Sequence, residues 1–204
     1  ISAIKQGTAA ILNIYLPGNY GADALADILS GEINPSGKLP ITYPRYTNSL
    51  TPYIHKYSDQ TSNPQGAYDY SADFNPQFQF GFGLSYTTFE YSNLTINKKT
   101  FDDANGSVTI NVTVKNTGTR EGKEVGQVFI SDVIASRAPD VKRLRAFEKI
   151  NLKAGDSKNI SFNVILKDLA FINTDNKKIV EAGEFKIQIG KLSTSFVVSK
   201  TAVF

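Results

Sequence analysis

The chain has no cysteine, no methionine and no tryptophan, and it has a single histidine, His55, among its 204 residues. Without thiols, disulfides, zinc–thiolate sites and cysteine nucleophiles are excluded. One histidine also excludes sites that need two, such as the histidine pair of a zinc metalloprotease helix. Because the chain begins at Ile1 and lacks methionine, we expect a processed product, a cloned piece or one part of a longer polypeptide. We expect no signal peptide in this chain, because its first residues lack a basic region followed by an apolar core.

An excess of charge of one sign is also lacking. The 22 Lys and Arg residues against 19 Asp and Glu residues leave a formal net charge of +3, with no concentrated basic stripe. We therefore expect no nucleic-acid partner. No apolar run approaches the roughly 18 residues of a membrane-spanning helix, so we expect no membrane partner. With 41% hydrophobic and 20% charged residues, the composition is that of an ordinary globular protein.

Alternation of apolar and polar residues dominates the chain from about residue 88 to its end. Val108, Ile110, Val112 and Val114, for example, are separated by polar residues. The candidate strands are 94–96, 108–114, 125–130, 144–152, 160–164, 185–189 and 196–198. Turn residues lie between them, as at Asn116-Thr117-Gly118. About seven strands with one apolar face each predict an antiparallel β-sandwich.

The first 43 residues have a different pattern. Ala9–Leu16 is a short apolar run, which is typical of a strand buried on both faces. Asn19–Gly31 has helical spacing of its apolar residues, with Gly31 placed to end the helix. Lys38–Tyr43 could form a second strand. Because roughly 40 residues rarely fold unaided, this β-α-β unit is expected to pack against something outside the chain.

Residues 44–87 combine proline with many tyrosines and phenylalanines. Proline at this density argues against long helices and central strands. The aromatic rings could stack on sugar rings, or they could join the two flanking parts of the chain. Between these two interpretations, the structural one is favoured.

Five segments together resemble the C-terminal part of family 3 glycoside hydrolases of the β-glucosidase and β-xylosidase type. They are Tyr15–Gly18 with Ala24–Gly31, Asn34–Pro44, Phe80–Phe89, Val112–Gly118 with Glu121–Phe129, and Leu144–Ile150 with Leu152–Gly155. The segments occur in the family's order and span almost the whole chain.

The resemblance implies a mainly β chain: an antiparallel fibronectin type III-like, immunoglobulin-like β-sandwich preceded by a partial β-α-β segment of an α/β sandwich. Residues 1–43 would be the end of the α/β sandwich domain, 44–87 a connection, and 88–204 the fibronectin-like domain. The parent protein would be a retaining β-glycosidase that acts on terminal β-linked sugars of oligosaccharides. It would be secreted or periplasmic, and it would need no cofactor and no metal.

The same resemblance places the nucleophilic Asp and the acid/base Glu upstream of this chain. We therefore assign no catalytic residue, and we expect the chain to act as a scaffold whose partner is the remainder of the glycosidase. The alternative is a stand-alone carbohydrate-binding or protein-interaction module. Where the family has an Arg between two tyrosines, this chain has Tyr68-Asp69-Tyr70, which is the candidate substrate-binding stretch.

Retaining glycoside hydrolysis needs two carboxyl groups about 5–5.5 Å apart. The candidate pairs are Asp69 with Asp73, Asp102 with Asp103, and Glu181 with Glu184, and for each a structural role is favoured. Glu32 and His55 are likewise expected in loops or at a domain interface.

A short basic cluster, 142–145, is expected to place Arg143 and Arg145 on one face of a strand. Arg145 could also form a buried ion pair with Glu148.

Overall fold

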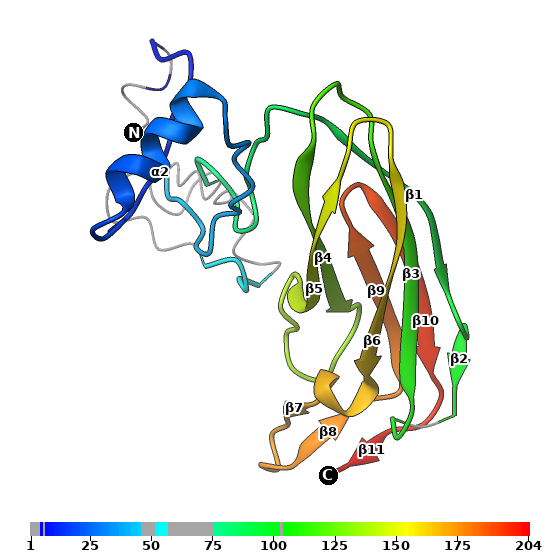
Figure 1. Cartoon of the computed structure of the whole chain (residues 1–204). Helices are drawn as coiled ribbons and strands as arrows, with labels where there is room; N and C mark the ends of the chain where they lie inside the picture. Colours follow the sequence, from blue (N-terminus) through cyan, green and yellow to red (C-terminus); the bar gives the residue numbers. More distant parts are fainter. Residues whose placement is uncertain (1–4, 6, 46–51, 57–75, 103) are drawn as a thin grey trace.

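The computed structural model describes residues 5, 7–45, 52–56, 76–102 and 104–204. Two β-sheets pack face to face and form the larger part of the molecule, and a segment with one helix lies beside them (Figure 1). Among the described helices, none combines the length and the apolar character needed to cross a bilayer.

The sandwich is built from a three-stranded and a five-stranded sheet. The first has the order β1 (Phe89–Ile96), β3 (Ser107–Asn116) and β6 (Ser157–Ile165). The second has the order β2 (Thr100–Phe101), β10 (Leu192–Val198), β9 (Gly183–Ile189), β4 (Gly122–Asp132) and β5 (Arg143–Leu152). A small third sheet contains β11 (Ala202–Val203), β8 (Lys178–Val180) and β7 (Phe171–Ile172). Among the described strands, only β2 and β10 pair in parallel.

The core lies between the two large sheets. The alternating apolar side chains of β3 are almost completely buried there, against those of β6, β9 and β10. Phe185 and Phe196 stack with ring centroids 5.4 Å apart, and Phe101 meets Phe196 edge-on at 5.5 Å. These rings fill one end of the core, since each can bury about 150–250 Å².

The structure confirms the predicted mainly β fold and antiparallel sandwich, and each of the seven candidate strands falls in an observed strand. One departure from alternation is informative. Val128, Phe129 and Ile130 are all buried in succession, and the register with β5 shifts between Val128 and Phe129. Phe129 is buried on the outer side of the sheet because Phe80 packs edge-on against it at 6.2 Å. The outer face of β4 is therefore covered by the preceding segment of the chain.

The predicted helix is confirmed as α2 (Gly21–Ser30). Gly31 ends it in the left-handed region, with φ of +81°, where a side chain would be strained. The backbone N–H of Gly31 donates to the carbonyl oxygen of Ile28.

The two strands predicted around this helix do not form. Residues 9–16 pair with no strand among the described residues, and the Leu16 side chain is 97% exposed. Residues 38–43 lie instead beside residues 77–82, with backbone bonds that include Leu39 N–H to the Phe82 carbonyl oxygen at 2.8 Å. An apolar run becomes a strand only when a neighbouring strand accepts its hydrogen bonds, and the described chain supplies no such neighbour.

The first prediction concerns the aromatic end of the core. Phe196→Ala should lower the free energy of unfolding by about 3–5 kcal/mol, because it removes a ring held between Phe101 and Phe185 and leaves a cavity. Phe147→Ala is the matched control, since that ring is 68% exposed on β5 and should change stability by less than about 0.5 kcal/mol. Denaturant unfolding measures both, and equal losses in the two variants would contradict this account of the core.

Candidate functional site

Polar and aromatic contacts join the chain that precedes β1 to the sandwich, and we call these contacts the joint. Asn34 is one anchor. Its side-chain Nδ2 donates to the carbonyl oxygen of Glu121 at 3.0 Å. Its Oδ1 accepts from the Ser85 hydroxyl and from the Tyr86 backbone N–H, both at 2.8 Å. One side chain thus connects three stretches of chain that are distant in sequence.

A buried carboxylate is the second anchor. Glu124 lies on β4 and is only 8% exposed. Its Oε2 lies 2.9 Å from Lys38 Nζ, and its Oε1 accepts from the Tyr91 hydroxyl at 2.9 Å. Lys38 also donates to the Gly83 carbonyl oxygen at 3.1 Å. Burial, together with the Glu124 charge, raises the pKa of Tyr91, so this phenol remains a donor to the carboxylate.

Asn116, which the sequence indicates only as a turn residue, ties the edge of the sandwich together. Its Nδ2 donates to the carbonyl oxygens of Arg120 at 2.7 Å and Leu152 at 3.0 Å. Its Oδ1 accepts from the Thr87 hydroxyl at 2.7 Å and from the Gly118 N–H at 3.1 Å. All the hydrogen-bonding capacity of this fully buried amide is therefore satisfied.

Aromatic rings form the next layer of the joint. Tyr53 stacks on Phe80 with centroids 4.2 Å apart, and Phe80 meets Phe129 of β4 edge-on. The Lys142 ammonium lies 4.7 Å from the centroid of the Phe129 ring, and burial lowers the pKa of Lys142. For these described rings, the structural interpretation of the aromatic segment is therefore the one observed.

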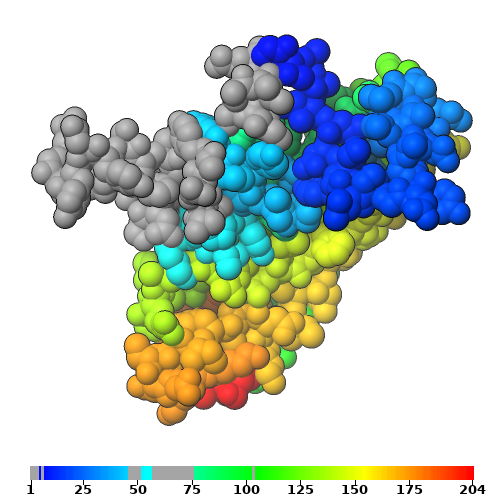
Figure 2. All heavy atoms as spheres, turned by 90° about the vertical axis from the view of Figure 1, so that its left-hand side faces the viewer, coloured from blue at the N-terminus to red at the C-terminus, as the bar shows by residue number. Residues whose placement is uncertain are grey.

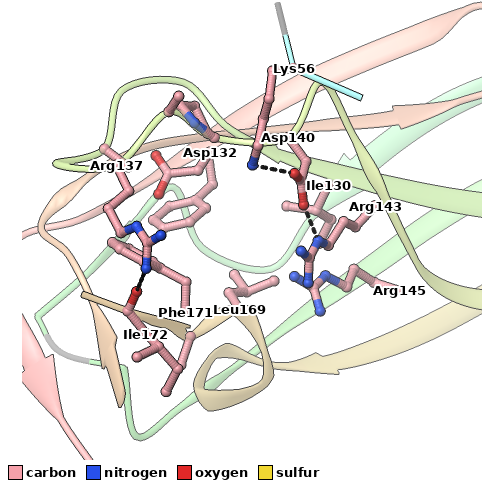
Figure 3. A pocket seen from close by; sticks show the side chains of 15 residues that line it. Lys56, Ile130, Asp132, Arg137, Asp140, Arg143, Arg145, Leu169, Phe171 and Ile172 are labelled. Carbon is pink, nitrogen blue, oxygen red and sulfur yellow. Dashed lines mark hydrogen bonds and ion pairs between the residues drawn. The ribbon is translucent and has the colours of Figure 1, made fainter. Parts of the chain in front are cut away.

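A pocket of about 400 Å³ lies beside this layer, between the segment at residues 52–56, the loop after β4, and the small third sheet (Figure 3). Asp140 accepts from Lys56 and from the Nε of Arg143. Burial by itself raises the pKa of Asp140, but these two hydrogen bonds outweigh it and hold the pKa below its ordinary value. Asp140 is therefore ionised at neutral pH and anchors the loop to Lys56.

Asp132 lies across the pocket from Arg143 and Arg145 (Figure 3). Burial and the nearby Glu181 charge raise its pKa to about 6, against the opposing effect of the Ile134 backbone N–H. Glu181 itself accepts from the Ser136 N–H at 2.8 Å. Two carboxylates thus face one loop, and one of them is destabilised in its charged form.

The pocket contains residues that sequence reasoning did not connect. Lys56 and Asp140 are 84 positions apart, and no local pattern predicts their contact. Of the sequence predictions, only the one for the basic cluster concerns residues of this pocket. Arg143 and Arg145 do share a face, and both line the pocket. The suggested Arg145–Glu148 pair is wrong, because Arg145 donates to the Asp168 carbonyl oxygen and Glu148 lies near Lys158.

The remaining candidates divide into two groups. Tyr68, Asp69, Tyr70, Asp73 and Asp103 lie outside the described residues, so the substrate-binding stretch stays a prediction. Among the described candidates, Glu32 and Asp102 are exposed. His55 belongs to the joint, because its carbonyl oxygen accepts from the Val141 N–H at 2.9 Å.

The α2 segment exposes many large apolar side chains. Leu29 on the helix is 70% exposed, and the flanking stretches expose further large side chains. They are Ile11, Leu12, Ile14, Leu16, Tyr20, Ile33 and Ile41. Figure 2 shows this part of the chain, in blue, at the surface above the yellow-green region that contains β5. We call these eight residues, including Leu29, the apolar face.

Comparison with known proteins identifies two family domains. Residues 1–86 match the glycosyl hydrolase family 3 C-terminal domain, and residues 124–193 match the fibronectin type III-like domain. A lysosomal beta glucosidase of Dictyostelium discoideum is 42% identical over 192 residues, which cover 89% of this chain and 22% of that protein. A periplasmic beta-glucosidase of Salmonella typhimurium is 41% identical over 191 residues, which cover 91% and 25%.

Solved structures agree with these matches. A β-glucosidase of Erythrobacter marinus superposes with a TM-score of 0.86 at 34% identity, covering 96% of this chain and 26% of that one. A beta-glucosidase of Listeria innocua in complex with glucose gives 0.86 at 30% identity, covering 96% and 29%. The chain therefore spans about a quarter of the length of these relatives.

The second prediction tests the buried carboxylate of the joint. Lys38→Met should lower the free energy of unfolding by about 3 kcal/mol, because it leaves the Glu124 charge buried without its cation. Lys123→Met is the matched control. Lys123 lies next to Glu124 on β4 with its side chain exposed, so this variant should change the free energy of unfolding very little. Urea unfolding of both variants is the measurement. A Lys38→Met variant as stable as the control would show that the ion pair does not hold the joint.

The third prediction uses the raised pKa of Asp132. Between about pH 4 and pH 6 the unfolded chain releases this proton before the folded chain does, so this group makes stability fall as pH rises through that window. Asp132→Asn cannot titrate and should flatten that slope, whereas Asp175→Asn at an exposed turn should leave it unchanged. Thermal unfolding across pH 4–7 measures the slopes. An unchanged slope in Asp132→Asn would contradict the assignment.

Proposed function

Since this chain belongs to glycosyl hydrolase family 3, whose C-terminal domain it carries together with a fibronectin type III-like domain, we propose that it is the non-catalytic C-terminal portion of a retaining β-glycosidase. The complete enzyme cleaves terminal β-linked sugars from oligosaccharides through a covalent glycosyl intermediate. The chain serves as a scaffold, and the reacting carboxyl groups belong to the remainder of the enzyme.

The apolar face is the observation that carries this proposal. Each leucine that passes from water into a packed interface contributes about 1.5–3 kcal/mol, and Leu16 and Leu29 are both largely exposed. In this proposal the exposed side chains form one surface, since a large exposed apolar patch marks an interaction site. The partner is the remainder of the glycosidase, whose α/β sandwich would supply the neighbouring strands that residues 9–16 lack.

The sandwich has a distinct part in this scaffold. The α2 segment is too small to hold its own shape. Asn34 and Lys38 fix it to β4 and to the residues that precede β1, so the apolar face is presented in one orientation. Glu124 of the joint and Asp140 of the pocket already serve this structural purpose.

The enzyme acts outside the cytoplasm, in a secreted or periplasmic location. Support comes from the relatives, one of which is named as periplasmic and another as lysosomal. The absence of cysteine from the chain neither favours nor opposes such a compartment.

The fourth prediction tests the scaffold role. The isolated chain should not hydrolyse a chromogenic β-glucoside. A chimaera of the Salmonella typhimurium periplasmic beta-glucosidase, with this chain in place of its matching quarter, should fold and retain at least a tenth of the parent's rate, about 1.4 kcal/mol in activation free energy. Robust turnover by the isolated chain, or a folded chimaera without activity, would contradict the proposal.

A pair of variants locates the contact. In the chimaera, Leu29→Asp places a charge in the proposed interface and should greatly reduce the yield of active enzyme. Ile165→Asp, at a half-exposed position on β6, should have little effect. Equal effects of the two variants would argue against docking through the apolar face.

A further inference from the structure

Two buried polar atoms of residues that line the pocket beside the joint lack hydrogen-bond partners within the described part of the chain. They are the Oδ1 of Asp132, an acceptor, and the Nε of Arg145, a donor. A buried polar group without a partner costs about 1–3 kcal/mol. Both atoms belong to residues that line one pocket, so the pocket has a donor residue and an acceptor residue whose hydrogen-bonding capacity the described protein does not use up.

The pocket also has a surplus of positive charge. Lys56 and Arg143 share Asp140 as their ion-pair partner. Arg137 and Arg145 each donate one bond to a backbone carbonyl oxygen, of Ile172 and Asp168 respectively, at 2.9 and 2.8 Å. Within the described residues, no carboxylate lies at ion-pair distance from either of these two. The Arg143 and Arg145 guanidinium groups lie next to each other in Figure 3. Their positive charges repel each other, and a bound anion would relieve that repulsion.

The walls of the pocket suit a ring rather than a bare ion. Leu169, Phe171 and Ile172 form an apolar side, and Asp132 and the arginines lie around it (Figure 3). At about 400 Å³, the pocket falls in the range of small-molecule sites. The C–H faces of a sugar ring can pack on such a wall while its hydroxyl groups bond to the polar side.

We propose that this pocket binds a hydroxylated carboxylate the size of a single uronic acid residue. The carboxylate accepts from the guanidinium groups of Arg145 and the neighbouring Arg143, because a guanidinium fork matches a carboxylate. A ring hydroxyl donates to the carboxylate of Asp132. At pH 7 Asp132 is mostly ionised, despite its raised pKa, and is therefore an acceptor. The site is separate from the apolar face and does not depend on the scaffold role.

The experiment is calorimetric titration of the 204-residue chain at pH 7 with D-glucuronate, D-glucose and acetate as separate probes. We expect saturable binding of glucuronate, at least about tenfold tighter than that of glucose, which lacks the carboxylate, or of acetate, which lacks the ring hydroxyls. Absence of saturable glucuronate binding overturns the proposal. Equal affinity for glucose or for acetate also overturns it.

Variants separate this pocket from other surfaces. Arg145→Gln should weaken glucuronate binding by about tenfold or more, since it removes a charge-assisted donor. Lys153→Gln removes the same unit of charge from an exposed turn at the far end of β5 and should leave the affinity unchanged. Because Arg145 also holds the Asp168 carbonyl oxygen, Arg137→Gln at the pocket rim is a second variant, with an expected loss of several-fold. Affinity unchanged in both arginine variants, or reduced as much in Lys153→Gln, overturns the proposal.

Discussion

The contact on which the rest of this structure depends is the buried carboxylate of Glu124 between Lys38 and Tyr91. A charge taken out of water is costly unless it is paired and hydrogen-bonded, and Glu124 meets both conditions with groups from the α2 segment and from β1. The pairing therefore exists only when the segment sits in one position on the sandwich. A roughly 40-residue segment that cannot bury enough apolar surface by itself obtains a defined position in this way.

This constraint explains the division of surfaces. The α2 segment contacts the sandwich through polar, hydrogen-bonded side chains such as Asn34, and it also carries exposed leucines and isoleucines. A segment held by specific polar contacts on one side leaves its hydrophobic surface available on the other. In the proposed scaffold, the sandwich thus holds an apolar face in a fixed orientation toward the remainder of the glycosidase.

The pocket follows from the same arrangement. Lys56 reaches Asp140 because the aromatic layer of Tyr53, Phe80 and Phe129 packs residues 52–56 against β4. Because Asp140 pairs with Lys56 and Arg143, Arg145 has no carboxylate at ion-pair distance within the described part of the chain. The surplus of positive charge in the proposed ligand site is therefore linked to the joint.

Local pattern and tertiary contact contributed differently to what is known of this protein. The period-two alternation in β3, β6 and β9 predicted the sandwich, because a strand with one buried face must alternate, and the spacing around Leu25 and Ile28 predicted α2. The resemblance carried by five short segments predicted the family. The apolar run at 9–16 predicts a strand but does not form one here. Strand formation depends on hydrogen bonds to a neighbouring strand, which no local pattern specifies.

The sequence by itself determined which strands and which helix have one apolar side, because the burial of apolar side chains imposes its pattern on each strand and helix locally. What only the tertiary structure decided is which charges meet. Glu124 and Lys38 are separated by more than 80 positions, as are Lys56 and Asp140. An ion pair requires proximity in space, and proximity follows from packing, so no spacing in the chain could reveal it.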